Sequence, residues 1–205
     1  MRFGRPADSR EVRDELIEQI SDAELVRAAQ IDVREFEHLY RRYRDPIMNY
    51  CFYRLGDQTE ADDAASTIFL DAIRALPALK IQDGSFRRWL FTIARNEVTD
   101  RWRQTAHHPK VSITAVETLS SPDISPEAQA VSSDGRRYVL TLLRSLPSRE
   151  REVLELRAGE LTTSEIAQFL GINEQAVRTA QCRAIARMKG LVRTKDASGQ
   201  EVSRV

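Results

Sequence analysis

The chain has 205 residues, of which 41% are hydrophobic and 30% charged, and its 31 basic and 31 acidic residues cancel. This length fits one large domain or two small ones, and the modest content of 8 glycines and 7 prolines excludes collagen-like and fully disordered chains. The neutral balance argues against a histone-like protein. It leaves nucleic-acid binding open, because the distribution of charge matters more than its sum.

The cysteines and the hydropathy of the chain limit which kinds of structural site and which cellular location we expect. The two cysteines, Cys51 and Cys182, lie far apart and in no C-x-x-C pattern, so we expect neither a disulfide scaffold nor a cysteine-based zinc site. Residues 1–13 lack the apolar core of a secretory signal, and no run of apolar residues is long enough to span a membrane. We therefore expect a soluble, cytoplasmic protein without membrane insertion.

Apolar residues recur with the helical period along most of the chain, which predicts an all-α fold. A short charged helix is expected within residues 1–20, and Ser21 with Glu24 forms a capping box that opens the next helix. A further helix begins at Phe36 with Tyr40 on its inward side, and Pro46 is compatible with the first turn of a new helix that ends at Gly56. Two more helices are expected over residues 60–76 and 86–103.

The composition changes at about Gln104. The thirty residues from 104 to 133 include six serines, three threonines and three prolines, but only four charged residues. We interpret residues 104–134 as a flexible linker between two small helical domains. The predicted layout is an N-terminal extension over 1–20, domains over 21–103 and 135–193, and a polar tail over 194–205.

Charge is segregated along this layout. Residues 57–71 carry five acids and no base, whereas residues 86–110 carry six bases and two acids, and residues 173–195 carry six bases and one acid. Basic segments suit phosphate groups, and an acidic helix suits a basic protein surface. The sequence therefore indicates two kinds of binding surface in a neutral chain.

Residues 161–177 carry the strongest local signal, that of a helix-turn-helix. Thr162 and Glu165 form a second capping box, Gly171 supplies the positive φ of a sharp turn, and Asn173 is a good N-cap for the following helix. In this motif the start of the second helix, expected at 174–188, enters the major groove of DNA. Its exposed side is expected to carry Gln175, Arg178, Thr179 and Arg183. The alternative is a helical hairpin whose basic residues are only solvated.

Aromatic and basic residues alternate over 86–103, a pattern that suits stacking on unpaired bases beside a nucleic-acid backbone. The alternative is that the aromatic residues form core and the arginines are solvated. For Trp89 we favour the core, because its neighbours are apolar. For Arg95, Asn96 and Arg103 composition leaves both interpretations open.

Five motifs in this order resemble bacterial RNA polymerase sigma factors of the extracytoplasmic-function (ECF) type. The motifs are DAELVRAAQ at 22–30, FEHLYRRY at 36–43, EADDAASTIFLDA at 60–72, FRRWLFTIARNEVTDRWR at 86–103, and LPSREREVLELR at 146–157 followed by the helix-turn-helix. The resemblance implies that residues 21–103 are a sigma region 2 domain and residues 135–193 a sigma region 4 domain. It covers about residues 21–192.

The resemblance also implies site residues. The acidic helix would dock on the clamp helices of the largest polymerase subunit, through Asp62, Asp63, Ser66, Thr67 and Phe69. The basic-aromatic helix and the loop before it would open and capture the minus-ten promoter element, through Lys80, Ser85, Phe86, Arg95, Asn96 and Arg103. The helix-turn-helix would read the minus-thirty-five element as duplex, through Thr162, Gln175, Arg178, Thr179 and Arg183.

The partners implied are core RNA polymerase, promoter DNA, and an anti-sigma factor or other regulator. We assign no catalytic residue, cofactor or metal site, because the three histidines lie in no cluster with other ligands and no glycine-rich phosphate loop is present. The alternative function is a two-domain helix-turn-helix regulator that binds duplex DNA without being a sigma subunit. That alternative leaves the acidic helix and the 86–103 motif unexplained.

One departure from the family concerns the acidic helix, where Ser66 and Thr67 stand in place of a Gln-Glu pair. Phosphorylation of either hydroxyl would restore the missing negative charge. The alternative is that Asp62 and Asp63 suffice for docking and the two hydroxyls are merely tolerated.

Overall fold

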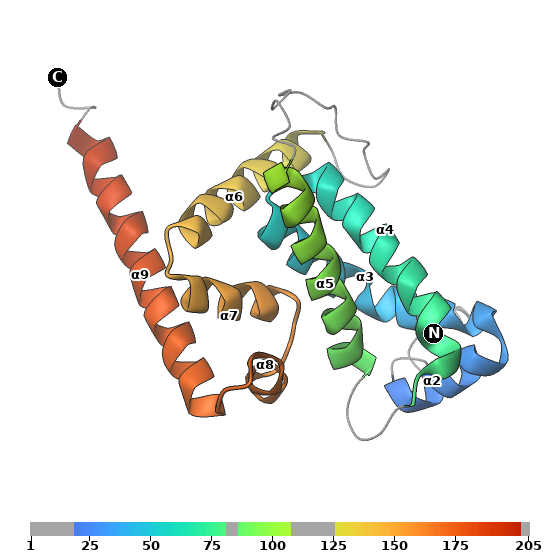
Figure 1. Ribbon diagram of the computed structural model, residues 1–205. Coiled ribbons are helices and arrows are strands. Elements are labelled where there is room, and N and C mark those ends of the chain that lie inside the picture. The colour runs from blue at the N-terminus through green and yellow to red at the C-terminus, as the bar shows by residue number, and fades with distance from the viewer. Residues whose placement is uncertain (1–18, 81–85, 108–125, 202–205) are drawn as a thin grey trace, which may run out of the picture.

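The computed structural model describes residues 19–80, 86–107 and 126–201, with side chains over 19–80, 86–104 and 134–193. Within these ranges every regular element is an α-helix or a short 3-10 helix, which confirms the all-α prediction (Figure 1). The elements are α2 (Asp22–Ile31), η1 (Val33–Glu35), α3 (Phe36–Leu55), α4 (Gln58–Ala75), η2 (Leu76–Ala78), α5 (Phe86–His107), α6 (Pro126–Arg144), α7 (Ser148–Ala158), α8 (Thr163–Leu170) and α9 (Glu174–Glu201). The helix expected within residues 1–20 falls almost wholly outside the described residues.

Local signals explain most helix ends in the first domain. The Ser21 side chain accepts a hydrogen bond from the Glu24 amide, and the Glu24 carboxylate accepts one from the Ser21 amide at 3.0 Å, so the predicted capping box is present. Gly56 ends α3 with a φ of 81°, in the left-handed region that favours glycine. Asp57 then caps α4 by accepting a 2.9 Å hydrogen bond from the Glu60 amide.

The prediction of a new helix at Pro46 was wrong, because α3 is one continuous helix with Pro46 inside it. A proline removes one backbone hydrogen bond from a helix. Here Pro46 is buried on the core side of α3, and burial of its apolar ring is a favourable contribution that opposes this loss. Tyr40 also departs from expectation, since 40% of it is exposed rather than turned inward.

The core of the first domain lies between α3, α4 and α5. The buried face of α4 consists largely of small residues, which allow α3 and α5 to approach closely: Ala61, Ala64, Ala65 and Ala72. Larger buried side chains fill the centre, and Phe86 at the start of α5 packs its ring against Phe36 and Tyr43. Trp89 is half-buried against this core, as predicted.

The second domain contains the predicted helix-turn-helix. Thr162 and Glu165 form the capping box of α8, Gly171 ends that helix with a φ of 64°, and the Asn173 side chain accepts a 2.7 Å hydrogen bond from the Ala176 amide at the start of α9.

Three helices are longer than predicted. On the two sides of the predicted linker, α5 extends to His107 and α6 begins at Pro126 rather than 135. At the other end of the second domain, α9 continues to Glu201, into the predicted polar tail.

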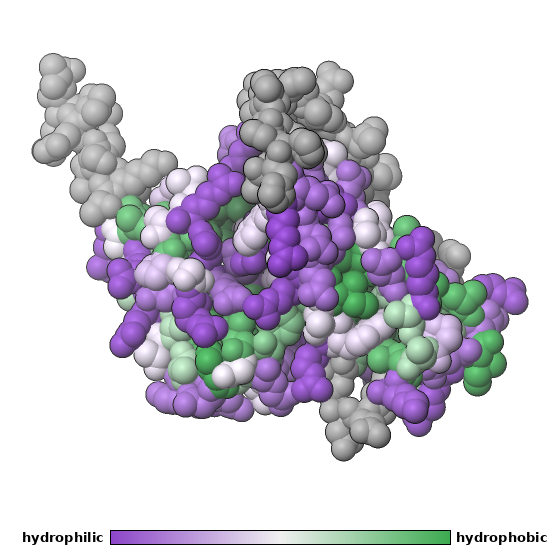
Figure 2. Space-filling model, viewed as in Figure 1, coloured by the Kyte–Doolittle hydropathy of each residue, from purple (hydrophilic) through white to green (hydrophobic). Residues whose placement is uncertain are grey.

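The two domains pack against each other through one continuous hydrophobic core. In Figure 1, α7 lies beside α3 and α5, while α4 lies on the far side of α5 and α9 stands at the outer edge of the molecule. Charged and polar residues cover most of the face shown in Figure 2, with smaller hydrophobic patches between them. Over the described ranges, we find no helix with the length and apolar character needed to cross a membrane.

Candidate functional site

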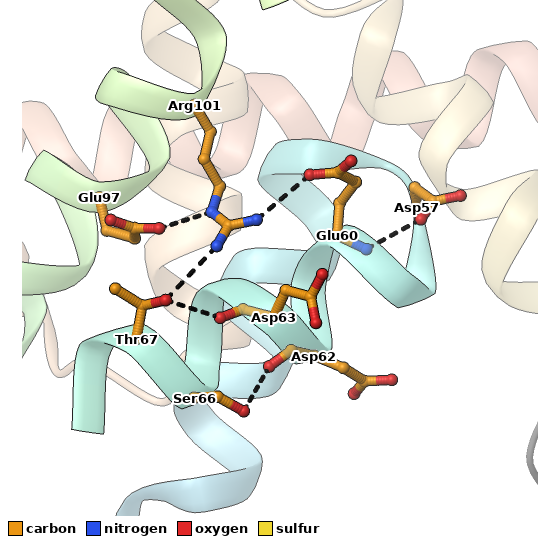
Figure 3. Close-up of polar contacts among 8 residues, drawn as sticks. All are labelled: Asp57, Glu60, Asp62, Asp63, Ser66, Thr67, Glu97 and Arg101. Atoms are coloured by element: carbon orange, nitrogen blue, oxygen red, sulfur yellow. Dashed lines mark hydrogen bonds and ion pairs between the residues drawn. The ribbon is translucent and has the colours of Figure 1, made fainter. Parts of the chain in front are cut away.

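The exposed acids of α4 form a surface that points away from the rest of the molecule. We define the acidic surface as Asp62, Asp63 and Ser66, all of which are exposed (Figure 3). The Ser66 hydroxyl donates a 2.9 Å hydrogen bond to the backbone carbonyl of Asp62, one turn earlier. Both carboxylates are exposed, and that of Asp62 accepts a 3.1 Å hydrogen bond from the Gln58 amide on the same helix.

Thr67 differs from Ser66 because it faces α5. Its hydroxyl donates to the Asp63 carbonyl at 3.0 Å and lies 3.5 Å from the Arg101 guanidinium. Arg101 in turn pairs with Glu97 at 2.5 Å and with Glu60 at 3.2 Å, as Figure 3 shows. Burial alone would lower the pKa of Arg101, but the carboxylates of Glu97 and Glu60 raise it above its usual value.

Two predicted site residues prove to be core, which corrects their assignment. Phe69 is only 5% exposed, and its ring centre lies 6.4 Å from that of Phe36 and 4.8 Å from that of Tyr40. Phe86 is fully buried. Both rings sit on the apolar stripe of their helix, so they hold α4 and α5 in place instead of presenting a binding contact.

The other residues assigned to the minus-ten element are mostly exposed. Arg95, Asn96 and Arg103 lie on the surface of α5, and Lys80 is exposed after η2. Arg103 pairs with Asp100 at 3.0 Å within the same helix. Ser85 and most of the preceding loop lie outside the described residues.

The helix-turn-helix presents four of the five predicted reading residues to solvent, and Thr179 is the exception. Gln175, Arg178 and Arg183 are exposed, and Arg178 pairs with Glu174 at 2.5 Å across one helical turn. Thr179 is half-buried and donates its hydroxyl to the Gln175 carbonyl, so it is less accessible than predicted. Thr162 is exposed, but its hydroxyl is engaged in capping α8.

Several polar residues at the junction of the two domains were not predicted. Arg54 on α3 donates a 2.8 Å hydrogen bond to Glu155 on α7, and Arg87 on α5 donates one of 2.9 Å to the carbonyl of Glu160. These partners lie 101 and 73 residues apart in the chain, so no local pattern could have linked them.

Comparison with known proteins agrees with this arrangement. The sigma-70 region 2 family matches residues 39–108, and the sigma-70 region 4 family matches residues 136–188. Together these matches cover more than half of the chain. They correspond to the helices that carry the acidic surface and to the helix-turn-helix domain.

Individual proteins show the same likeness. The chain is 33% identical over 173 residues to the ECF RNA polymerase sigma factor BldN of Streptomyces coelicolor, covering 82% of this chain and 65% of BldN. It is 33% identical over 174 residues to the ECF RNA polymerase sigma factor ShbA of Streptomyces griseus, covering 80% of this chain and 91% of ShbA. A third relative, SigD of Mycobacterium tuberculosis, is 31% identical, with 82% of each chain covered.

The fold is also that of solved sigma factors. CnrH, in complex with the cytosolic domain of CnrY, matches with a TM-score of 0.64 and 24% identity over 84% of this chain and 97% of CnrH. RpoE of Bartonella quintana, in complex with the anti-sigma factor NepR, matches with a TM-score of 0.55 and 18% identity over 78% of this chain and 98% of RpoE. The chain therefore belongs to the ECF RNA polymerase sigma factors, which direct RNA polymerase to specific promoters.

Proposed function

We propose that the three charged helices divide the work of promoter recognition: α4 docks on core polymerase, α5 captures the opened minus-ten element, and α9 reads the minus-thirty-five duplex. The observation that supports this division is the separation of exposed charge. Acids project from α4, whereas exposed arginines project from α5 and α9. This separation suits a chain that binds two partners at once, a basic protein surface through the acids of α4 and nucleic acid through the arginines of α5 and α9.

Docking on polymerase is assigned to Asp62, Asp63 and the neighbouring Ser66. Both carboxylates are exposed, so a basic partner can pair with them without first breaking an ion pair. Thr67 contributes indirectly, because its contact with Arg101 fixes α4 against α5. Phe69 is buried in the core and makes no docking contact.

Minus-ten capture is assigned to Asn96, Arg95 and Arg103, together with Lys80 before the loop. The Asn96 amide can donate to and accept from a base edge, and the arginines can neutralise phosphates. Extruding a base from the duplex costs a few kcal/mol, which binding to core polymerase has to offset. For that reason the isolated chain is expected to bind promoter duplex poorly.

Minus-thirty-five reading is assigned to Gln175, Arg178 and Arg183 at the exposed start and middle of α9. Arginine reads guanine and glutamine reads adenine through paired hydrogen bonds in the major groove. Glu174 lies beside Arg178 and limits the rotamers that its guanidinium adopts before it meets DNA. The exposed position of these side chains supports the assignment.

The chain itself is proposed to catalyse no reaction and to need no cofactor or metal. Polymerase performs the phosphoryl transfer, and this subunit supplies position and strand capture in the cytoplasm, where polymerase acts. An anti-sigma factor is also a proposed partner, because RpoE of Bartonella quintana, which shares the fold, was solved in complex with the anti-sigma factor NepR.

Reconstitution with core polymerase tests the proposed division. The chain should co-elute with core enzyme and open a promoter, and Asn96→Ala should slow opening, as followed by permanganate footprinting, with little change in duplex affinity. Gln104→Ala is a matched control, because it removes an exposed amide about 12 Å further along α5. Normal melting by Asn96→Ala would refute the capture role, and tight duplex binding without polymerase would favour the regulator alternative.

A further inference from the structure

The last turn of α2 contacts the chain segment that follows α4. Gln30, the penultimate residue of α2, donates its side-chain amide to the backbone carbonyl of Leu76 at 2.9 Å and to that of Leu79 at 2.8 Å. One amide group therefore binds two carbonyls that lie 46 and 49 residues further along the chain. Gln30 is an exposed residue, so a substitution there removes these two hydrogen bonds without opening the core.

The two carbonyls belong to the end of a helical segment. α4 continues into η2, and the last carbonyls of such a segment have no partner within it. The Leu79 amide donates to the Leu76 carbonyl at 3.1 Å, and the backbone then becomes extended at Leu79, with φ −71° and ψ 119°. The Gln30 amide supplies a donor to the carbonyls before and after this change of direction. It therefore fixes the point at which the chain leaves η2.

Both sides of this contact are held by the first domain. At the other end of α2, Asp22 accepts a 2.6 Å hydrogen bond from Arg42 and another from the Tyr43 hydroxyl, both on α3. Leu76, at the start of η2, lies in the core and is 1% exposed. Gln30 thus reaches from one anchored element to another.

Lys80 is the residue whose position depends on this contact. It follows Leu79 directly and is exposed, and five residues separate it from Phe86, which is fully buried at the start of α5. A lysine side chain is flexible, so the position of its backbone decides which phosphates its ammonium group can reach. Holding that backbone in place before DNA arrives removes part of the entropy cost of binding.

We propose that Gln30 is a positioning residue for minus-ten capture: its amide holds Leu79 so that Lys80 meets a phosphate of the opened strand. Gln30 itself touches no DNA. This inference rests on the proposed minus-ten role of Lys80. It adds a residue of α2, a helix that has no part in the proposed division of promoter recognition.

Three variants test the proposal. Gln30→Met keeps the length and neutrality of the side chain but has no donor, and Lys80→Ala removes the ammonium group on which Gln30 is proposed to act. The third variant combines the two substitutions. Gln104→Met is the matched control, because it makes the same chemical change at an exposed glutamine on α5. Circular dichroism and urea denaturation establish that each variant is folded.

The measurement is binding of each holoenzyme to a fluorescent single-stranded oligonucleotide over a range of salt concentrations. The oligonucleotide carries a minus-ten sequence selected with the unmodified holoenzyme. Lys80→Ala should weaken binding about fivefold and reduce the steepness of log affinity against log salt by about 0.7, the value for one phosphate contact on a single strand. Gln30→Met should produce both changes, to no greater extent, because it misplaces the same ammonium group. The double variant should bind no more weakly than Lys80→Ala, and the control should match the unmodified chain.

An unchanged salt dependence in Gln30→Met would show that the contact only stabilises the fold, and would overturn the proposal. Losses that add up in the double variant would also overturn it, because independent effects add. The single variants separate this inference from the one on which it rests. If Lys80→Ala binds like the unmodified chain, the minus-ten role of Lys80 fails and this inference fails with it. If Lys80→Ala weakens binding and Gln30→Met does not, only the inference fails.

Discussion

The Glu155 carboxylate on α7 accepts a hydrogen bond of 2.8 Å from the Arg54 guanidinium on α3, across the junction of the two sigma domains. Arg151 approaches the other carboxylate oxygen at 3.7 Å, and the Trp102 ring covers the guanidinium. The pair is thus shielded from solvent on both sides. It joins a region 2 helix to a region 4 helix at a point where both domains also share hydrophobic core.

Breaking this pair should destabilise the chain. Glu155→Ala leaves the Arg54 guanidinium buried without its carboxylate, which should lower the free energy of unfolding by up to about 5 kcal/mol. The double variant Arg54→Met, Glu155→Leu should lose much less, because it removes both charges together. Urea denaturation of Arg54→Met, of Glu155→Leu and of the double variant measures the coupling energy of the pair, and losses that add up in the double variant would contradict it.

The acidic surface should be required for binding core polymerase. Replacing Asp62 and Asp63 with Lys should abolish co-purification with core enzyme while leaving helicity intact. Asp71→Lys is a control, because its carboxylate lies on the same helix but half a revolution from Asp62 and already pairs with Arg74. Glu60 is the acid in the first turn of α4, so Asp62 and Asp63 stabilise the helix N-terminus little. If binding persists after the double replacement, these two acids do not dock on polymerase.

The start of α9 should set promoter preference. Arg178→Ala should cost about 1–3 kcal/mol at one base pair of the minus-thirty-five element and relax specificity there. Lys189→Ala, later on the helix, should weaken binding on all sequences alike. Arg187 is unsuitable for the same comparison, because it pairs with the buried Glu150 at 3.0 Å. Selection of promoter variants with the holoenzyme checks both effects. If Arg178→Ala keeps the same base preference in the minus-thirty-five element, Arg178 does not read that element.

Added negative charge should act differently at the two hydroxyls of α4. Ser66→Glu places a carboxylate on the acidic surface and should tighten core binding by up to about fivefold, as for one exposed ion pair. Thr67→Glu should change affinity little, because its carboxylate meets Arg101 within the domain. Titration of core enzyme with each variant and with Ser66→Gln separates charge from size. A larger gain in core affinity for Thr67→Glu than for Ser66→Glu would contradict the inward orientation of Thr67. If both Glu variants bind core enzyme as tightly as the unmodified chain, added negative charge has no effect and phosphorylation would have none on docking.

The two cysteines should differ in reactivity. Burial raises the pKa of the Cys51 thiol to about 12, whereas Cys182 is exposed on α9. At pH 8 the folded chain should therefore take up one maleimide per molecule, at Cys182, and the urea-unfolded chain should take up two. Mass spectrometry of the labelled chain decides this, and rapid labelling of Cys51 in the folded chain would show that the core between α3 and α5 opens readily.

Much of the secondary structure could be predicted because its causes are local. The capping boxes at Ser21 and Thr162 and the glycine at 171 act within a few residues, and each is present as expected. Pro46 shows the limit of local reasoning, since α3 continues through this residue and its ring is buried in the tertiary structure.

The candidate site could be predicted only in part. Phe69 was assigned to the surface from its place in a motif, although its spacing from Ala61 and Ala65 on the same helix already placed it on the buried stripe. Phe86 shares a stripe with Leu90 in the same way. The ion pair of Arg54 and Glu155 carried no signal at all, because it exists only once two distant helices pack together.

Run-off transcription from a library of genomic fragments, with core polymerase and the purified chain, tests the central claim most directly. The account predicts a discrete set of transcripts that share a minus-ten and a minus-thirty-five element, absent with core enzyme alone and absent with the variant in which Asp62 and Asp63 are replaced by Lys. The same transcripts from core enzyme without the chain, or an undiminished set with that variant, would contradict it.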